Sequence, residues 1–324
     1  MHVMPAWCRD VGALGTDAPI PLDRPFSATE ATRLGVGESL RRRLVERGLL
    51  RPVLRGVFVA PTVPDSFRLR VAALELVVPE HAVVVDRTAA WLHGVDALPR
   101  SAIHEMPVLD VFSRSGSRMR RPGVASGVRT LTTRDLDQIG TLTVTTPLRT
   151  ACDLGRLLWR FDSLSAIDGF LRLGLDHGLL ISEVPRFAGH RGIRQLRTLA
   201  PLGDAGAESP PESALRLHWY DAELPRPETQ VWVEGDAGVP RFRIDVGDAD
   251  VRYGAEYFGE AYHGDDECRH DEDRLDWLRD QRGWHMDVFT KHDVYGPELA
   301  ASDRLRAGHA AAAAHRPTYI DLSR

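Results

Sequence analysis

The charge of this chain changes sign along its length, and this division constrains the fold more than any single motif. Residues 1–207 contain 27 basic and 21 acidic side chains, whereas residues 208–324 contain 14 basic and 25 acidic ones. A chain of 324 residues is too long for one ordinary core, and the region 203–211 has the Gly, Ala and Pro content of a linker. We therefore expect a multidomain α+β protein, with a basic part suited to phosphate and an acidic part suited to a divalent cation.

The apolar pattern argues against a membrane or secreted protein. No apolar run approaches the roughly 18 residues of a membrane helix, and residues 1–22 lack the basic start and continuous apolar stretch of a signal peptide. Cys8, Cys152 and Cys268 are too few and too far apart for a disulfide framework or a zinc motif. We expect a soluble, cytoplasmic protein with no membrane partner, in which residues 1–24 form a loose tail.

Residues 25–62 have the element order of a winged helix-turn-helix. Ser27–Glu30 is a capping box that begins a short helix, and Gly35–Gly37 interrupts that helix. Glu38–Arg47 is expected as a second helix, followed by two short extended runs around Arg55–Gly56. A helix, a tight turn, a basic helix and a hairpin are the parts of a winged DNA-binding module, with the second helix in the recognition position.

Basic side chains concentrate in this segment. Between Arg24 and Phe58 there are eight basic residues and three acidic ones. Arginines on a recognition helix and a wing can neutralise phosphates and hydrogen-bond the edges of guanine bases. A solvated helix face is the alternative interpretation of such a run. The residues that we expect to contact DNA are Arg41, Arg42, Arg43, Arg47 and Arg55.

The remainder of the chain alternates between helical and extended patterns. In the mixed α/β region 63–202, helices are expected over 64–78, 86–94, 146–158 and 163–175, with strands between 108 and 146. After the linker 203–211, the pattern of residues 212–324 predicts a small α/β domain. Its expected elements are a helix over 212–223, three strands within 231–257, a helix over 271–282, a strand over 284–289 and a helix over 297–314.

Three acidic residues of this last domain are candidates for a metal site. Glu212 lies early on a helix, and Asp245 and Glu256 lie on neighbouring strands joined by a turn, so their side chains can meet at one sheet edge. Carboxylates that converge repel one another unless a cation such as Mg²⁺ lies between them, and such an ion activates water for phosphodiester hydrolysis. His263 could transfer a proton. The alternative is that these acids lie on the surface of an acidic domain.

An ordered series of segments in this domain resembles the very-short-patch-repair-like endonuclease domains of the PD-(D/E)xK nuclease superfamily. The resemblance covers about Glu208–Arg306. The matching segments are Glu208–Arg216, Leu224–Pro227, Arg243–Val246, Ala255–Gly259, His263, Arg274, Gly283–Trp284 and Val288–Thr290. The resemblance implies a PD-(D/E)xK-like fold, with Glu212, Asp245 and Glu256 as ligands of Mg²⁺ or Mn²⁺ and His263 as the nearby catalytic histidine.

The sequence departs from that superfamily at Phe258. The superfamily pattern has a lysine two residues after the second acid, and the endonuclease domains that it resembles commonly have an aspartate there. A phenylalanine can neither orient a water molecule nor bind a metal. Lys291 or His263 could supply the missing function.

The front of the chain, from Phe26 to about Ala200, is similar to the AbiEi family of type IV toxin–antitoxin antitoxins. Besides the winged helix, the segments that carry the similarity are Arg55–Phe58, Ala89–Gly94 and Thr146–Ala151. This similarity implies a DNA-binding regulator whose protein partner is a nucleotidyltransferase-type toxin.

Two main functions follow from these patterns, and a weaker third is a phage-defence module whose last domain is triggered by invading DNA. The first is a DNA-binding, Mg²⁺-dependent endonuclease whose front part selects the site, for which the intact acidic residues argue. The second is a transcriptional regulator or type IV antitoxin that uses a degraded nuclease fold to bind DNA or a partner, for which Phe258 and the acidity of the last domain argue. Whether the chain is an enzyme is left open by the sequence.

Overall fold

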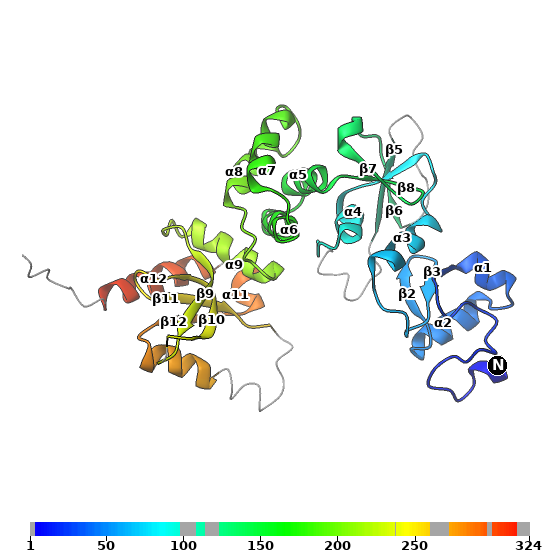
Figure 1. Ribbon diagram of the computed structural model, residues 1–324, viewed down its shortest axis with the longest axis horizontal. Helices are drawn as coiled ribbons and strands as arrows, with labels where there is room; N and C mark the ends of the chain where they lie inside the picture. The colour runs from blue at the N-terminus through cyan, green and yellow to red at the C-terminus, as the bar shows by residue number, and fades with distance from the viewer. Residues whose placement is uncertain are drawn as a thin grey trace, which may run out of the picture. The chain divides into compact units, whose positions relative to one another are not determined.

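The computed structural model describes residues 4–97, 108–113, 123–236, 238–259, 272–296 and 300–315. The chain is divided into two compact units, residues 1–153 and residues 154–324 (Figure 1). Each unit mixes helices with β-sheet, so the expected α+β multidomain class is confirmed at this level. Within the described residues, no helix is both long enough and apolar enough to cross a membrane.

The first unit begins with the expected helix, turn, helix and hairpin. Ser27 ends strand β1 and accepts a hydrogen bond from the Glu30 amide at 3.0 Å, which caps helix α1. Gly35 has a φ of +85°, as the turn between the two helices requires. The elements are β1 (Phe26–Ser27), α1 (Ala28–Arg33), α2 (Glu38–Glu46), β2 (Arg51–Leu54) and β3 (Val57–Val59), and the strands pair in the order β1-β3-β2.

Residues 4–24, which belong to the segment 1–24 that the sequence suggests is a loose tail, pack against these helices. A 3-10 helix, η1 (Ala6–Cys8), buries Cys8, and Ile20 is buried in the same core as Leu44 of α2. In the sequence, the apolar residues of this segment are interspersed with charged ones. Composition alone therefore did not predict that they pack into the core. The segment is part of the first folded unit.

A five-stranded sheet forms the rest of the first unit. Its strand order is β6-β5-β4-β8-β7, with β4 parallel to β8 and antiparallel to β5. The strands are β4 (Ala82–Val84), β5 (Leu109–Ser113), β6 (Val124–Ala125), β7 (Leu136–Ile139) and β8 (Leu142–Thr145). The helical elements are α3 (Phe67–Glu75), α4 (Asp86–His93), η3 (Thr133–Asp135) and α5 (Pro147–Leu157), of which α5 crosses the unit boundary. Leu54 and Val57 of the hairpin share one core with Leu74 and Val144, so the β2–β3 hairpin and the five-stranded sheet pack together.

Helices dominate the start of the second unit. They are α6 (Arg160–Arg172), α7 (His177–Glu183), η4 (Val184–Phe187), α8 (Ile193–Leu199), η5 (Ala200–Leu202) and α9 (Pro210–Asp221). The segment 203–211 between η5 and α9 does not have the open structure expected of a linker. The Asp204 amide donates to Asp168 Oδ1 at 2.8 Å, Thr229 donates to Asp204 at 3.1 Å, and Ala207 is buried.

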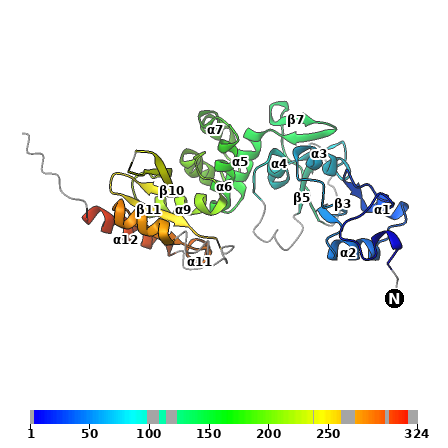
Figure 2. The ribbon, with the colours of Figure 1, turned by 60° about the horizontal axis from the view of Figure 1, so that its bottom comes forward.

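A four-stranded sheet completes the second unit, in the order β12-β11-β10-β9. Strands β9, β10 and β11 form the expected antiparallel meander, and β12 adds parallel to β11. Helices α9 and α12 pack on each other and on this sheet, and α12 lies alongside β11 and β12 in both ribbon views (Figures 1 and 2). The elements are β9 (Glu228–Glu234), β10 (Pro240–Asp248), β11 (Tyr253–Tyr257), the π-helical η6 (Trp277–Gln281), β12 (His285–Phe289), α11 (Lys291–Tyr295) and α12 (Ala301–Ala314).

Candidate functional site

The arginines of helix α2 do not share one environment. Arg42 is strongly exposed, with 72% of its side chain accessible, and its only ion pair within the described residues is a 3.9 Å contact with Glu46. Arg41 is buried, and its guanidinium donates to Thr32 Oγ1 at 2.8 Å and to the Val36 carbonyl at 2.6 Å. Arg41 therefore joins α2 to the preceding turn, and the structure removes it from the expected DNA-contacting set.

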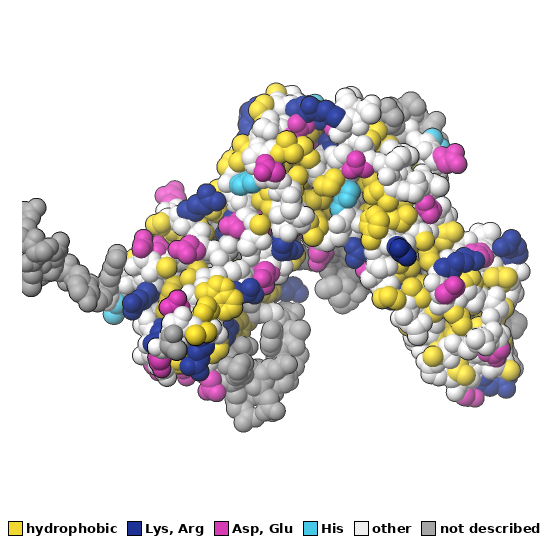
Figure 3. Space-filling view, viewed as in Figure 1, with side chains coloured by type: hydrophobic (Ala, Val, Ile, Leu, Met, Phe, Trp, Pro, Cys, Tyr) yellow, Lys and Arg dark blue, Asp and Glu magenta, His cyan; other side chains and the backbone are white. Residues whose placement is uncertain are grey.

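The other basic residues of this segment lie at or near the surface. Arg43 is partly buried, and Arg47 is exposed while its Nη1 donates to the Cys8 carbonyl at 3.2 Å. Arg55 is exposed in the turn between β2 and β3, beside Gly123. On the face drawn in Figure 3, basic side chains (dark blue) are interspersed with acidic ones (magenta) around α1 and α2. On this face, any phosphate contact would come from a few arginines rather than from a continuous basic patch.

The carboxylates of the second unit do come together. Val246 of β10 pairs with Ala255 of β11, which places Asp245 and Glu256 opposite each other one residue farther from the turn. Burial, together with the neighbouring charges of Glu212 and Glu256, raises the pKa of Asp245 to about 7, although the hydrogen bond from the Tyr257 amide opposes the shift. The proximity expected from the sequence is therefore present.

Donors of the chain itself already satisfy these carboxylates. Glu256 is 2% exposed and accepts two hydrogen bonds from Arg274, at 2.6 and 2.8 Å. Glu212 accepts from Ser209 Oγ at 2.7 Å, from the Glu208 amide at 2.9 Å and from Gln230 at 2.9 Å, as part of the N-terminal cap of α9. A bidentate guanidinium supplies the positive charge that a cation would otherwise supply.

This arrangement does not fit a divalent cation. A metal would have to displace Arg274 from Glu256 and the cap donors from Glu212, and the guanidinium charge would repel it. In the described ranges, no group of three or more His, Cys, Asp and Glu side chains is arranged to hold a metal ion. Phe258 packs against the apolar core of this sheet, next to residues such as Trp284 and Met286, rather than lining a polar site.

His263 and Lys291 are the remaining residues with a predicted catalytic role. His263 lies outside the described residues. Lys291, considered as a substitute for the missing lysine, is the first residue of α11, which begins after a capping box made by Thr290 and Asp293.

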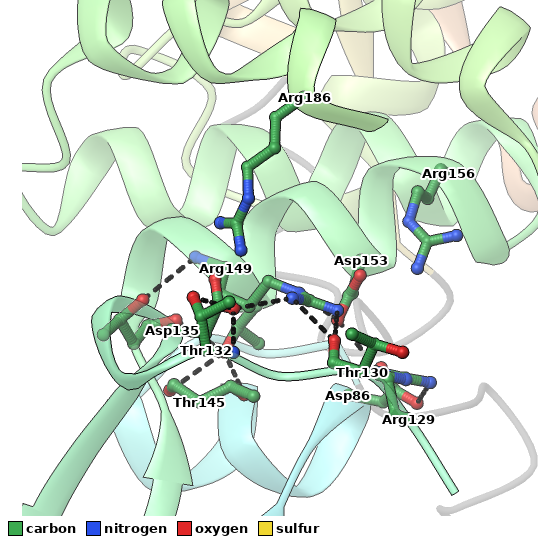
Figure 4. Close-up of polar contacts among 12 residues, drawn as sticks. Asp86, Arg129, Thr130, Thr132, Asp135, Thr145, Arg149, Asp153, Arg156 and Arg186 are labelled. Atoms are coloured by element: carbon green, nitrogen blue, oxygen red, sulfur yellow. Dashed lines mark hydrogen bonds and ion pairs between the residues drawn. The ribbon is translucent and has the colours of Figure 1, made fainter. Parts of the chain in front are cut away.

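A buried ion network in the first unit could not be predicted from sequence spacing alone. Arg129 binds both oxygens of Asp86, at 2.6 and 2.7 Å, and contacts Asp153 at 3.0 Å (Figure 4). Arg149, whose side chain is 4% exposed, donates to Asp153 at 2.8 Å and contacts Asp135 at 3.1 Å. Only the Arg149–Asp153 pair can be predicted from the sequence, because the two residues are four positions apart on one helix.

The network fixes α4 and α5 against the loop that contains Arg129. Asp86, the first residue of α4, has a φ of +49°, which is a strained conformation for a residue with a β-carbon. Asp110 lies beside it, and burial together with the Asp86 charge raises the pKa of Asp110 to about 6. Each arginine of the network is paired with carboxylates, which is the arrangement of a structural core rather than of a catalytic centre.

Comparison with known proteins places this network in a recognised domain. Residues 81–202 match the family described as the AbiEi antitoxin C-terminal domain. Two uncharacterized proteins of Mycobacterium tuberculosis, Rv2248 of strain H37Rv and MT2308 of strain CDC 1551 / Oshkosh, are each 35% identical to this chain over 253 residues. The aligned region covers 77% of this chain and 89% of each relative.

The chain belongs to the family of these mycobacterial proteins. It also contains an AbiEi antitoxin C-terminal domain. This AbiEi domain includes the whole ion network described above and ends at Leu202, whose carbonyl accepts a hydrogen bond from Arg216 of α9. Within the second unit, direct contacts therefore join the AbiEi domain to α9, which packs on the sheet that follows, and these contacts include a buried ion pair between Arg216 and Asp168.

Proposed function

We propose that this protein is a DNA-binding transcriptional regulator of the type IV antitoxin class. The match of residues 81–202 to the AbiEi antitoxin C-terminal domain is the observation that carries the proposal. In this proposal the segment before the AbiEi domain binds DNA as a winged helix-turn-helix, and the AbiEi domain engages a toxin of the nucleotidyltransferase type.

The local geometry supports the DNA-binding part. A helix, a glycine turn, a second helix and a two-stranded hairpin follow one another from Ala28 to Val59, as they do in winged DNA-binding modules. Arg42 is exposed and weakly paired on the second helix, and Arg55 is exposed in the hairpin turn. These two positions suit a recognition helix and a wing that contact phosphates or guanine edges.

The carboxylate cluster supports a regulatory rather than a hydrolytic role for the last domain. Arg274 neutralises Glu256, and Glu212 is used as a helix cap. Phe258 adds an apolar side chain where the nuclease pattern has a polar one. We propose that this sheet is retained as a binding scaffold.

DNA binding is tested by fluorescence anisotropy with a labelled duplex from the region upstream of the chain's own gene, compared with an unrelated duplex. The double variant Arg42→Ala and Arg43→Ala is expected to bind more weakly, with a slope of log affinity against log salt that is smaller by about 1.8 for two lost phosphate contacts. The matched control is Arg226→Ala, an exposed arginine before β9 that makes no ion pair with a described residue. Unchanged affinity and salt slope in the double variant would refute the recognition helix.

The antitoxin part has its own test. Co-expression with a nucleotidyltransferase toxin encoded beside this chain is expected to restore growth that the toxin alone arrests. The Arg42→Ala and Arg43→Ala variant should still restore growth, because those residues precede the AbiEi domain. Growth arrest that persists with the wild-type chain would overturn the antitoxin assignment while leaving the DNA-binding result intact.

A further inference from the structure

A pocket of about 680 Å³ lies at the turn between β10 and β11. The antiparallel register pairs Asp248 with Tyr253 next to this turn, whereas Asp245 and Glu256 lie toward the other end of the same strands. The pocket is therefore separate from the carboxylate cluster. Its lining residues come from the turn, from the segment that ends η6 and begins β12, and from the end of α12.

The pocket is basic within an acidic region. Its ionisable lining residues are Arg252, Arg279, His285, His315 and Asp250. Residues 208–324 as a whole have 25 acidic and 14 basic side chains, so a local excess of basic groups is unusual there. An anion is the ligand whose charge this pocket complements.

Both arginines are held in place and keep donors for a ligand. Arg252 Nη1 donates to the Arg282 carbonyl at 3.2 Å, and Arg279 Nη2 donates to the Met286 carbonyl at 3.1 Å. The one ion pair of Arg279 with a described residue is a 3.8 Å contact with Asp276. A guanidinium has five N–H donors in a planar fork that matches the oxygens of a phosphate, so most donors of each group remain for a ligand.

The backbone of Arg252 is strained. Its φ is +53°, in the left-handed region where glycine and asparagine are more at ease than arginine. The Arg252 carbonyl accepts a hydrogen bond from the His285 amide at 2.8 Å, which ties this conformation to the start of β12. Strained residues of this kind concentrate at ligand sites, and here the strain holds a basic side chain in a pocket.

The C-terminal end of helix α12 forms the third side of the pocket. His309 Nε2 contacts Asp248 Oδ2 at 2.9 Å, and the His309 ring packs edge-on against Trp219 and Tyr253. Ala312 lies three residues after His309, about one turn farther along α12, and His315 follows the last residue of the helix. Ala312 and His315 line the pocket together with Arg252 and Arg279.

We propose that this pocket binds a phosphorylated small molecule of nucleotide size, with Arg252 and Arg279 contacting the phosphate. The volume lies in the range of small-molecule sites, and the two guanidinium groups that line the pocket suit a phosphate ester. The surrounding acidic residues disfavour a long polyanion such as duplex DNA, because it would extend over them. Binding of this ligand would regulate the proposed DNA-binding protein through a site separate from the carboxylate cluster.

Isothermal titration of the full chain with ATP, and separately with inorganic pyrophosphate, tests this proposal in buffer that contains EDTA. Arg252→Gly and Arg279→Gln are each expected to weaken binding by about tenfold, as the loss of a charge-assisted contact does. Arg252→Gly suits the left-handed backbone, so its folding should be preserved. Arg226→Ala and Asp245→Ala should bind like the wild type.

Each other outcome overturns the proposal. Absence of binding by both probes at millimolar concentration would do so, and so would equal binding by the wild type and both pocket variants. Binding that is lost in Asp245→Ala but kept in Arg252→Gly would assign the ligand to the carboxylate cluster. Pocket variants that weaken the binding of a duplex but not of ATP would make the pocket a DNA contact and refute a small-molecule site.

Discussion

The buried ion pair between Asp168 of α6 and Arg216 of α9 gives the sharpest stability prediction. Both side chains are 0% exposed, and Arg216 Nη2 lies 2.5 Å from Asp168 Oδ2. Asp168 also accepts the Asp204 amide, and Arg216 Nε has no hydrogen-bond partner among the described residues. Asp168→Ala would leave a guanidinium buried without its counter-charge, which costs about 3–5 kcal/mol, and would remove the Asp204 hydrogen bond, which adds about 1 kcal/mol.

The expected loss is therefore about 4–6 kcal/mol for Asp168→Ala. With a urea m-value of about 2 kcal/mol/M, the unfolding midpoint of the second unit should fall by about 2–3 M. Circular dichroism against urea measures this shift. The control is the double variant Asp168→Leu with Arg216→Met, which replaces the pair by apolar side chains and should recover most of the loss.

Two outcomes would refute this reasoning. A loss below about 1 kcal/mol for Asp168→Ala would mean that water or a rearrangement compensates Arg216. A double variant as unstable as the single one would mean that packing, rather than the uncompensated charge, dominates. Either result would also weaken the conclusion that the AbiEi domain and the following sheet are joined across segment 203–211.

Two further predictions concern the first unit. Arg41→Ala should lower the free energy of unfolding by about 2 kcal/mol through loss of the hydrogen bonds to Thr32 and Val36, whereas the exposed Arg42→Ala should change it little; thermal denaturation of both variants checks this. Asp110 has a raised pKa of about 6, so the folded state keeps a proton that the unfolded state loses, and stability should fall as pH rises from about 4 to about 6. Asp110→Asn should flatten that part of the profile by up to about 3 kcal/mol, and an unchanged profile would contradict the raised pKa.

Local signals in the sequence predicted the elements well. The capping role of Ser27, the glycine turn and the helix at Glu38 were confirmed, because each depends on residues close together in the chain. The antiparallel meander and the proximity of Asp245 to Glu256 were also confirmed, since the turn between their strands fixes the register.

Long-range contacts could not be predicted in the same way. The burial of Arg41 depends on a carbonyl exposed by the preceding turn, and the fixed path of segment 203–211 depends on Asp168, which lies in a different helix. Arg274 is 18 residues from Glu256, so nothing in the spacing showed that it would take the place of a cation. In each case a polar group is satisfied by a partner that the local sequence pattern does not contain.

A plasmid assay distinguishes a DNA-binding regulator from an endonuclease. Supercoiled DNA that contains the upstream region is incubated with the chain and Mg²⁺ or Mn²⁺, and both gel retardation and nicking are measured for the wild type and for Asp245→Ala. We predict that both proteins retard the DNA equally and that neither nicks it, as expected for a regulator in which Arg274 pairs with Glu256 and Glu212 caps a helix. Metal-dependent nicking by the wild type that is lost in Asp245→Ala would contradict this account and establish an endonuclease.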